Sequence, residues 1–225
     1  MGVTTGLPML RTFLCLYATI AAAAAMGQVA APVGPSPHGA PIHPAAQVTQ
    51  ALARRILLTN DHAGLPFAIV DKRAATVIVY HNDGSPAGFS NVLLGRALGD
   101  QSAAGVGERT QTRTLRAQDR TTPAGKFASA PGRNLAGEAV VWVDYSSAFS
   151  IHRLRPGPGW PLRVRQLASP VALERRLSDG CVVVPEAFYL AVIAPVLGQG
   201  RAWVYVLPEA GAWEQIWPEL AAPQS

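Results

Sequence analysis

The feature that most constrains the fold is a series of short apolar runs with turn residues between them. The runs begin near residue 67, and most contain four to seven residues rich in Val, Ile, Leu and aromatic side chains. Gly, Pro, Asn or Asp stands at many of their ends, and runs bounded in this way predict β-strands. The expected strands span 67–70, 76–80, 92–95, 139–145, 149–152, 182–184 and 202–207, with one more after the Pro-Ala-Gly turn at 123–125.

Helical patterns are fewer than strand patterns. Residues 47–59 carry apolar side chains at close to helical spacing, which predicts a short amphipathic helix. A second helix is expected from Pro185 to residue 197, because proline is favoured in the first turn of a helix. The Pro- and Gly-rich stretch 153–163 is expected to be a loop. The sequence therefore predicts one α+β domain, mostly β, with a helix embedded after the cysteine at position 181.

The N-terminal segment has the marks of an export signal. Arg11 precedes an alanine-rich apolar run, residues 12–26, and small residues follow it. This order is typical of a cleaved secretory signal peptide, and the run is short for a membrane anchor. We expect a signal peptide over 1–30, a Pro/Ala-rich linker over 31–46 and a folded domain over 47–225, secreted to the periplasm or cell envelope. No other segment is long and apolar enough to cross a membrane, so no stable insertion is expected after cleavage.

Composition narrows the class of partner. The chain is 49% hydrophobic and 15% charged, which fits a folded globular protein. Its net charge of +5 falls to 18 − 14 = +4 once the signal peptide, which holds Arg11 and no acid, is removed. The arginines are scattered, with no basic stripe interleaved with aromatic residues, so nucleic acid is not an expected partner. An acidic polymer of the cell envelope suits the same charge.

The cysteine count raises a question about chemistry. Of the two cysteines, Cys15 lies in the signal peptide, so Cys181 is alone in the expected mature chain. A lone thiol cannot form an internal disulfide. It is either a buried, inert group that packs like a small hydrophobe or a nucleophile, and composition leaves both readings open.

The neighbours of the thiol favour the nucleophile. Cys181 ends the run Ser-Asp-Gly-Cys, and Gly180 permits a sharp turn there. The N–H groups of Gly180 and Cys181 are candidates for an oxyanion hole, and Ser178 is placed to hydrogen-bond the turn or the base. Histidine is the usual base, and His152 alone among five histidines ends an apolar strand ahead of the cysteine. A histidine at a strand end is more often structural, but its pairing with a sole thiol behind a glycine favours a catalytic role.

A metal site is not expected. His38 and His43 lie in the linker, where no acidic or cysteine partner stands at ligand spacing.

Three motifs together resemble the L,D-transpeptidases, the cysteine enzymes that cross-link bacterial peptidoglycan. One is the strand ending in Ile-His at 151–152, and another is Ser-x-Gly-Cys followed by Val at 178–182. The third is Thr-Pro-Ala-Gly-Lys-Phe at 122–127, which is similar to that family's Thr-Pro-x-Gly-x-Phe turn. The resemblance covers about residues 66–208.

The resemblance implies a β-sandwich with the cysteine and the histidine facing one cleft. Cys181 would attack the carbonyl of the third residue of a donor stem tetrapeptide and expel the terminal D-alanine. The thioester would then pass its acyl group to an acceptor amine, or to water. His152 would accept the thiol proton and protonate the leaving amine, with the backbone carbonyl of Arg153 orienting it. Peptidoglycan stem peptides are the implied partners, and the resemblance implies no metal or organic cofactor.

The chain departs from the family at three places. Asp179 stands where the family usually has His, and a carboxylate there disfavours the thiolate unless it pairs with an arginine such as Arg176. Val183 replaces an Arg or Asn that many members carry. The spacing from histidine to cysteine, 181 − 152 = 29 positions, is longer than the common one. The extra residues lie in 153–176, which we expect to act as a lid. Its candidate donors for the carboxylate of the substrate are Arg153, Arg155, Arg163 and Arg165, and Arg153, Arg176 and Asp179 are the predicted substrate-binding residues.

Two alternatives share the fold, and one does not. An L,D-carboxypeptidase would use the same acyl-enzyme with water as the acceptor, and a catalytically silent envelope-binding module would retain only the fold. A cysteine peptidase of another fold is disfavoured, because there the cysteine generally precedes the histidine in the chain.

Overall fold

The computed structural model describes residues 1–2 and 44–221. The chain divides into two units, Met1–Ala40 and Pro41–Ser225, and all that follows concerns the second. The predicted signal peptide lies outside the described residues apart from residues 1–2, and so does the predicted linker up to residue 43. Among the helices that the structure describes, none has the length and apolar character needed to cross a membrane.

The second unit is mostly β, as predicted. Eight strands form one mixed sheet in the order β3-β2-β1-β10-β5-β6-β7-β9, and β4 pairs with β8 beside it. The strands are β1 (Phe67–Asp71), β2 (Thr76–Tyr80), β3 (Pro86–Asn91), β4 (Leu94–Gly95), β5 (Gly125–Arg133), β6 (Ala139–Asp144), β7 (Phe149–Arg153), β8 (Arg176–Ser178), β9 (Val182–Val184) and β10 (Ala202–Val206).

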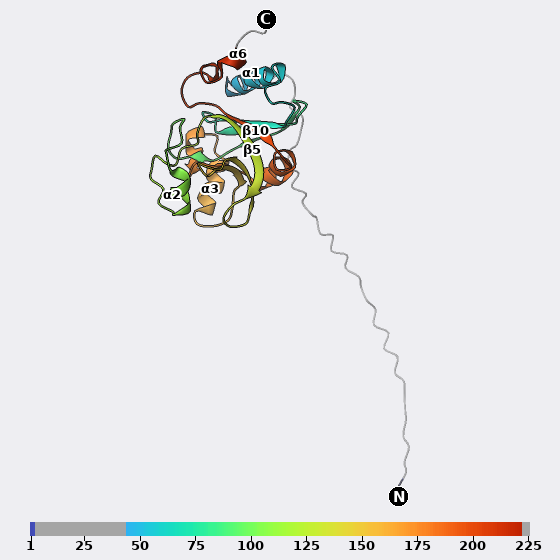
Figure 1. The fold of residues 1–225 in the computed structure, drawn as a ribbon. Coiled ribbons are helices and arrows are strands. Elements are labelled where there is room, and N and C mark those ends of the chain that lie inside the picture. Colours follow the sequence, from blue (N-terminus) through green and yellow to red (C-terminus); the bar gives the residue numbers. More distant parts are fainter. Residues whose placement is uncertain (3–43, 222–225) are drawn as a thin grey trace. The chain divides into compact units, whose positions relative to one another are not determined.

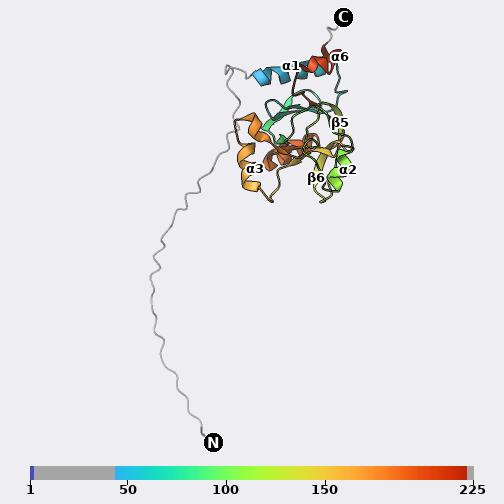
Figure 2. The same ribbon diagram turned by 90° about the vertical axis from the view of Figure 1, so that its left-hand side faces the viewer.

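Helices are short and few. They are α1 (Pro44–Leu58), α2 (Val106–Gln111), α3 (Trp160–Leu167), α4 (Glu186–Phe188), α5 (Ala194–Val196) and α6 (Pro218–Ala221), with 3-10 turns η1 (Ala172–Arg175) and η3 (Trp213–Gln215) and the π-helical turn η2 (Tyr189–Ile193). In Figures 1 and 2, α1 and α6 lie together at one end of the unit, whereas α2 and α3 lie at the other.

The long strand β5 joins the sheet's two halves. Its first five residues pair with β10, and its last four pair with β6. Apolar side chains from β1 and β2 in one half, and from β6, β7 and β9 in the other, share a single core. At the far edges, Leu93, which follows β3, exchanges backbone hydrogen bonds with Val183 of β9. The two halves therefore pack around one core, which gives the predicted sandwich-like arrangement.

A second core lies on the outer face of β1 and β10. Leu52 and Ile56 of α1 pack there against Phe67 and Tyr205, and Trp217 closes the cluster beside α6. His152 and Cys181 are not part of this cluster, which covers the face of the sheet opposite the shared core.

The sequence prediction differs from the structure in several elements, and it contains neither α2 nor β8. The strand predicted at 92–95 is present as the short strand β4, but β3 at 86–91 was not expected, because an edge strand of mixed polarity gives no apolar run. The expected loop 153–163 contains the start of α3, which Pro161 opens in its first turn. The N-terminal helix begins at Pro44, three residues before the predicted start. The helix predicted after Cys181 is present as a helical stretch from Glu186 to Val196, with a π-helical turn inside it.

Candidate active site

The parallel pairing of β7 with β9 determines which side chains meet. Ile151 lies opposite Val182 and His152 opposite Val183. Because side chains alternate along a strand, Ile151 and Val182 point into the shared core, and His152 points to the other face. Cys181 directly precedes β9, so its side chain falls on the same outer face as His152.

The thiol of Cys181 has polar neighbours within contact distance. Ser150, two residues before His152 on β7, places its hydroxyl 3.5 Å from Sγ, and Sγ also lies 3.5 Å from the carbonyl oxygen of Ala148. Burial raises the pKa of the Cys181 thiol. The hydrogen bond with His152, the charge of His152 and the hydrogen bonds with Ser150 lower this pKa by a larger amount. The net pKa is below the ordinary value, as a nucleophilic thiol requires.

His152 is oriented by the backbone. Its Nδ1 lies 2.9 Å from the carbonyl oxygen of Arg153. A carbonyl can only accept, so Nδ1 carries the proton and Nε2 is left to receive a proton from the thiol. The Arg153 carbonyl thus occupies the place that the resemblance implied.

The Arg153 side chain has other partners. Its guanidinium pairs with Glu186 and Glu138, and Arg155 also pairs with Glu138. These ion pairs hold the strand end that carries the carbonyl. The guanidinium of Arg153, predicted to bind substrate, is therefore already engaged.

The turn before the cysteine is held by its own side chains. Ser178 Oγ donates to the Cys181 carbonyl at 2.6 Å and accepts from the Gly180 N–H at 3.1 Å. Gly180 has φ +121°, and a Cβ added there would stand 3.0 Å from the Thr121 carbonyl oxygen, so glycine is needed for both conformation and space. Thr122 Oγ1 donates to the Gly180 carbonyl at 2.8 Å. Since the Gly180 N–H is engaged, the Cys181 N–H is the stronger candidate for an oxyanion contact.

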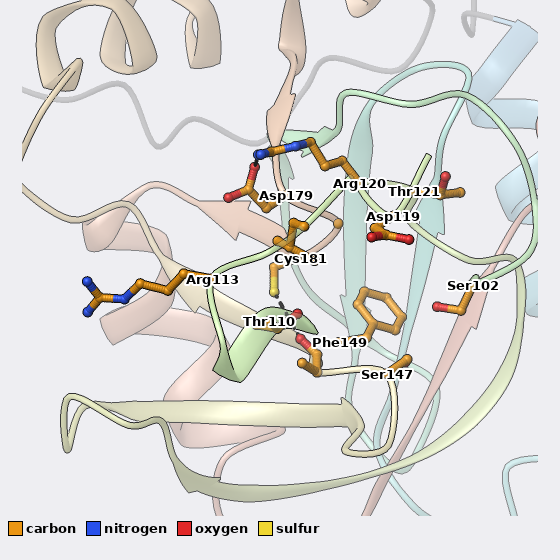
Figure 3. Close-up of a pocket in the computed structure, with 13 residues that line it drawn as sticks. Ser102, Thr110, Arg113, Asp119, Arg120, Thr121, Ser147, Phe149, Asp179 and Cys181 are labelled. Atoms are coloured by element: carbon orange, nitrogen blue, oxygen red, sulfur yellow. Dashed lines mark hydrogen bonds and ion pairs between the residues drawn. The ribbon is translucent and has the colours of Figure 1, made fainter. Parts of the chain in front are cut away.

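A pocket of about 260 Å³ opens beside the thiol. Residues 102–121, named here the wall segment, form much of its lining; residues 147–149 and 179–181 complete it. The charged and polar side chains around Cys181 come mainly from this segment, as Figure 3 shows. His152 does not line this pocket, so it approaches the thiol from another side.

Two ion pairs organise the charge of the pocket. Arg109 makes a two-pronged contact with the buried carboxylate of Asp119, at 2.7 and 2.6 Å, which lowers the pKa of Asp119 to about 2. Arg120 pairs with Asp179, and the two side chains point toward one another in Figure 3. Asp179 therefore has an arginine partner that neutralises its charge near the thiol.

That partner is not Arg176, the arginine considered from the sequence. Arg176 is directed to Glu209 and donates to the Lys72 carbonyl at 2.8 Å, away from the pocket. The β8 strand, which begins at Arg176, turns alternate side chains to opposite faces, and this one is nearly buried. The structure does not bring Arg176 into the site.

The unusual Val183 is explained by the long insertion. Its side chain is buried with Leu93, Leu154 and Leu167, and Leu167 belongs to α3. The residues that lengthen the spacing between histidine and cysteine thus form a helix that covers this valine.

The predicted lid arginines do not reach the pocket. Arg163 Nη2 donates to the Arg155 carbonyl at 3.0 Å, Arg165 is exposed on α3, and none of the four lines the cavity. Residues 153–176 pack against β9, so the prediction that they form a lid over the pocket is not supported by the structure.

Sequence reasoning missed several residues of the candidate site. The sequence could have indicated Ser150, because it lies two positions before His152 and therefore on the same face of the strand. Thr122 lay inside the recognised Thr-Pro-x-Gly motif, although its bond to Gly180 was not foreseen. Arg120 and Asp119 had no signal, since their partners are 59 and 10 residues away and depend on the path of a loop.

No metal centre is indicated by the described residues, which contain no group of three or more His, Cys, Asp or Glu side chains placed to hold an ion. The polar groups around the thiol are hydroxyls, backbone carbonyls and arginine pairs.

Comparison with known proteins gives weak likenesses only. No family model matches the sequence, and no curated protein matches it. Among solved structures, the helical cell shape determining protein Pgp2 from Campylobacter jejuni is 16% identical, with a TM-score of 0.43 over 66% of this chain and 49% of that one. A point mutant of Pgp2 gives 17% identity and a TM-score of 0.42, over 70% and 52% of the two chains.

A third structure, the Ldtfm-avibactam carbamoyl enzyme, is 15% identical, with a TM-score of 0.37 over 64% of this chain and 49% of that one. The chain therefore spans about half the length of each of these proteins. The function below is argued from the chain's own residues.

Proposed function

We propose that this protein is an exported L,D-transpeptidase, which forms a Cys181 thioester with a peptidoglycan stem tetrapeptide and passes the acyl group to an acceptor amine. One observation carries the proposal. Cys181 and His152 lie on the same outer face of β7 and β9, and the pKa of the thiol is lowered by His152 despite its burial. A thiolate with an oriented base beside it is what acyl transfer requires.

The reaction follows from these positions. Nε2 of His152 accepts the thiol proton as Sγ attacks the carbonyl carbon of the third residue of the donor. The Cys181 N–H is placed to stabilise the negative oxygen that forms. When the C–N bond to the terminal D-alanine breaks, the imidazolium gives its proton to the leaving amine. The acceptor amine then attacks the thioester, His152 takes its proton, and the thiolate is released and reprotonated.

The resemblance supports the substrate, and the geometry supports the chemistry. Thr122 of the Thr-Pro-x-Gly motif bonds the carbonyl of Gly180 in the Ser-x-Gly-Cys motif, so two motifs recognised separately form one substructure. This bond joins two residues that are 58 positions apart in the sequence. A shared site gives both motifs a common role.

A carbapenem tests the proposal directly. Incubated with the purified protein, it is expected to add the mass of one opened carbapenem, and Cys181→Ala is expected to abolish that addition. Ser102→Ala, at the opposite part of the pocket lining, is the matched control and should still be acylated. A folded protein with a titratable thiol that gains no adduct would contradict the proposal and favour a silent binding module.

The acceptor is tested with disaccharide-tetrapeptide. Cross-linked dimers are expected for a transpeptidase, and mass spectrometry of the products detects them. If tripeptide accumulates without dimers, water is the acceptor and the protein is an L,D-carboxypeptidase instead.

A further inference from the structure

The pocket contains a charged group that the steps above do not use. We propose that Arg120 forms a subsite for a carboxylate of the acyl donor in the pocket that Cys181 also lines. The identity of the donor as a stem peptide rests on the proposed function; attraction of an anionic group to this pocket does not.

The charge balance of the pocket favours an anion. Four charged side chains line it, and Asp119 among them is buried and neutralised by Arg109 from outside the lining. Arg113, Arg120 and Asp179 remain, which gives two positive charges against one negative. A cleft lined by a net positive charge attracts anionic ligands.

The guanidinium of Arg120 has donors to spare. Its Nη1 contacts Asp179, and within the described part of the chain Nε and Nη2 bond to no other group. The side chain is 27% exposed and belongs to the lining of the pocket. A guanidinium fork suits a carboxylate, which it can bind with two parallel hydrogen bonds.

Asp179 leaves Nε and Nη2 of Arg120 free. Its own side chain is 55% exposed, and it uses only one end of the guanidinium. A donor carboxylate can therefore bind Arg120 while the pair with Asp179 persists, which keeps the charge of Asp179 from acting on the thiolate. Arg113 extends away from Cys181 in Figure 3, so it adds to the positive charge at the rim and makes no direct contact with the thiol.

The subsite is tested with two small alkylating agents that differ in one charge. Iodoacetate carries a carboxylate, and iodoacetamide is its neutral counterpart; both react with the same thiolate. The ratio of their rate constants at Cys181, measured at one pH, therefore cancels any change in the fraction of thiolate. It reports how strongly the pocket attracts a carboxylate.

Arg120→Gln is expected to lower the ratio of iodoacetate to iodoacetamide rates by about two- to fivefold, the range expected for one partly exposed charge pair. Asp179→Asn is expected to raise it by about twofold, because a repelling charge is removed. Arg54→Gln, on exposed α1, is the control that loses the same net charge outside the pocket and should leave the ratio unchanged. An unchanged ratio in Arg120→Gln, or an equal fall in Arg54→Gln, would overturn the subsite.

Salt gives a test that needs no variant. In the unaltered protein the ratio should exceed that of free cysteine and fall toward it as NaCl is raised, because salt screens charges. A ratio equal to that of free cysteine at low salt would also overturn the proposal.

A peptide pair joins the subsite to the proposed function. The stem tetrapeptide and its C-terminal amide are compared as acyl donors, and Arg120→Gln should slow acylation by the acid more than by the amide. If neither peptide acylates Cys181, the proposed function fails while the alkylation ratio still decides the subsite. If both acylate and Arg120→Gln slows them equally, the subsite fails and the function stands.

Discussion

The two sides of the candidate site are built by different means. On one side, Ser150, His152 and Cys181 are placed by the hydrogen-bonded ladder of β7 and β9 and by the core beneath it. On the other, the wall segment has one short helix, α2, and two ion pairs, Arg109 with Asp119 and Arg120 with Asp179. The groups we assign to the chemistry thus lie on a strand face, whereas the groups we assign to recognition lie on a loop tied by ion pairs.

This difference indicates which side of the site tolerates substitutions. A strand ladder fixes a nucleophile and a base within a narrow geometry, as catalysis needs. A loop held by a few ion pairs can alter its charge without disturbing that geometry. The departure at Asp179 fits this division, because its compensating partner, Arg120, comes from the loop.

The largest effect on stability is expected from Lys72, which anchors the wall segment. Lys72 Nζ is fully buried and binds the Gly99 carbonyl at 2.6 Å, Asp100 at 2.6 Å and the Thr122 carbonyl at 3.0 Å, so it joins the two ends of the loop. Lys72→Met is expected to lower the free energy of unfolding by about 3 kcal/mol, because it leaves these partners uncompensated. Denaturant unfolding measures this.

Hydrogen exchange then shows whether the wall segment loses protection independently of β7 and β9. In Lys72→Met, amides of residues 102–121 should exchange faster while those of β7 and β9 keep their protection. Lys126→Met, which removes the chain's other lysine from its pair with Asp61, is the control and should leave the wall segment unchanged. Equal loss of protection on both sides would break the comparison.

Acid tests the pair inside the wall segment. The pKa of Asp119 is lowered to about 2 in the folded protein from 3.8, so the unfolded state binds more protons between these values. The stability from Asp119 is therefore present above about pH 4 and lost as pH falls toward 2. The difference in melting temperature between the unaltered protein and Asp119→Asn should shrink over that range.

The exposed carboxyl of Glu219 on α6 supplies the control for that titration, as Glu219→Gln. A difference between the unaltered protein and Asp119→Asn that stays constant from pH 4 to pH 2 would show that the carboxylate of Asp119 does not stabilise the wall segment.

On the strand side, Ser150 gives the smallest effect. Its hydroxyl lowers the pKa of the Cys181 thiol, so Ser150→Ala should raise that pKa and slow alkylation by iodoacetamide at neutral pH by about threefold. Ser147→Ala, a pocket-lining serine with no bond to Sγ, is the matched control. Equal rates for Ser150→Ala and the unaltered protein would remove Ser150 from the site.

A similar difference, between local patterns and contacts from distant parts of the chain, explains how much of the fold could be predicted from the sequence. The hairpin of β1 and β2, the strands β6, β7 and β10 and the helical stretch after Cys181 follow from local apolar patterns and turn residues. The edge strand β3 and helix α3 do not, because β3 is half exposed and α3 is stabilised by contacts with Leu93 and Val183 from other parts of the chain.

The residues of the candidate site also fall into those that the sequence predicts and those that it does not. Cys181 and His152 could be paired because strand order and motif place both near one sheet edge. The pairing of Arg120 with Asp179 depends on how a loop folds over the cysteine, and no periodicity encodes that. Arg176 was a reasonable partner by proximity in sequence, but the β8 strand turns it toward Glu209.

The most direct test of the central claim is the pH profile of the thiol in His152→Ala. With the neutral reagent iodoacetamide, the midpoint for reaction at Cys181 should shift to higher pH, and the rate at neutral pH should fall by about tenfold or more, because the thiolate loses its largest stabilising partner. The control is His81→Ala, because His81 is an exposed histidine in the turn between β2 and β3. A profile unchanged from that of the unaltered protein would show that His152 is structural and that Cys181 has no base at this position.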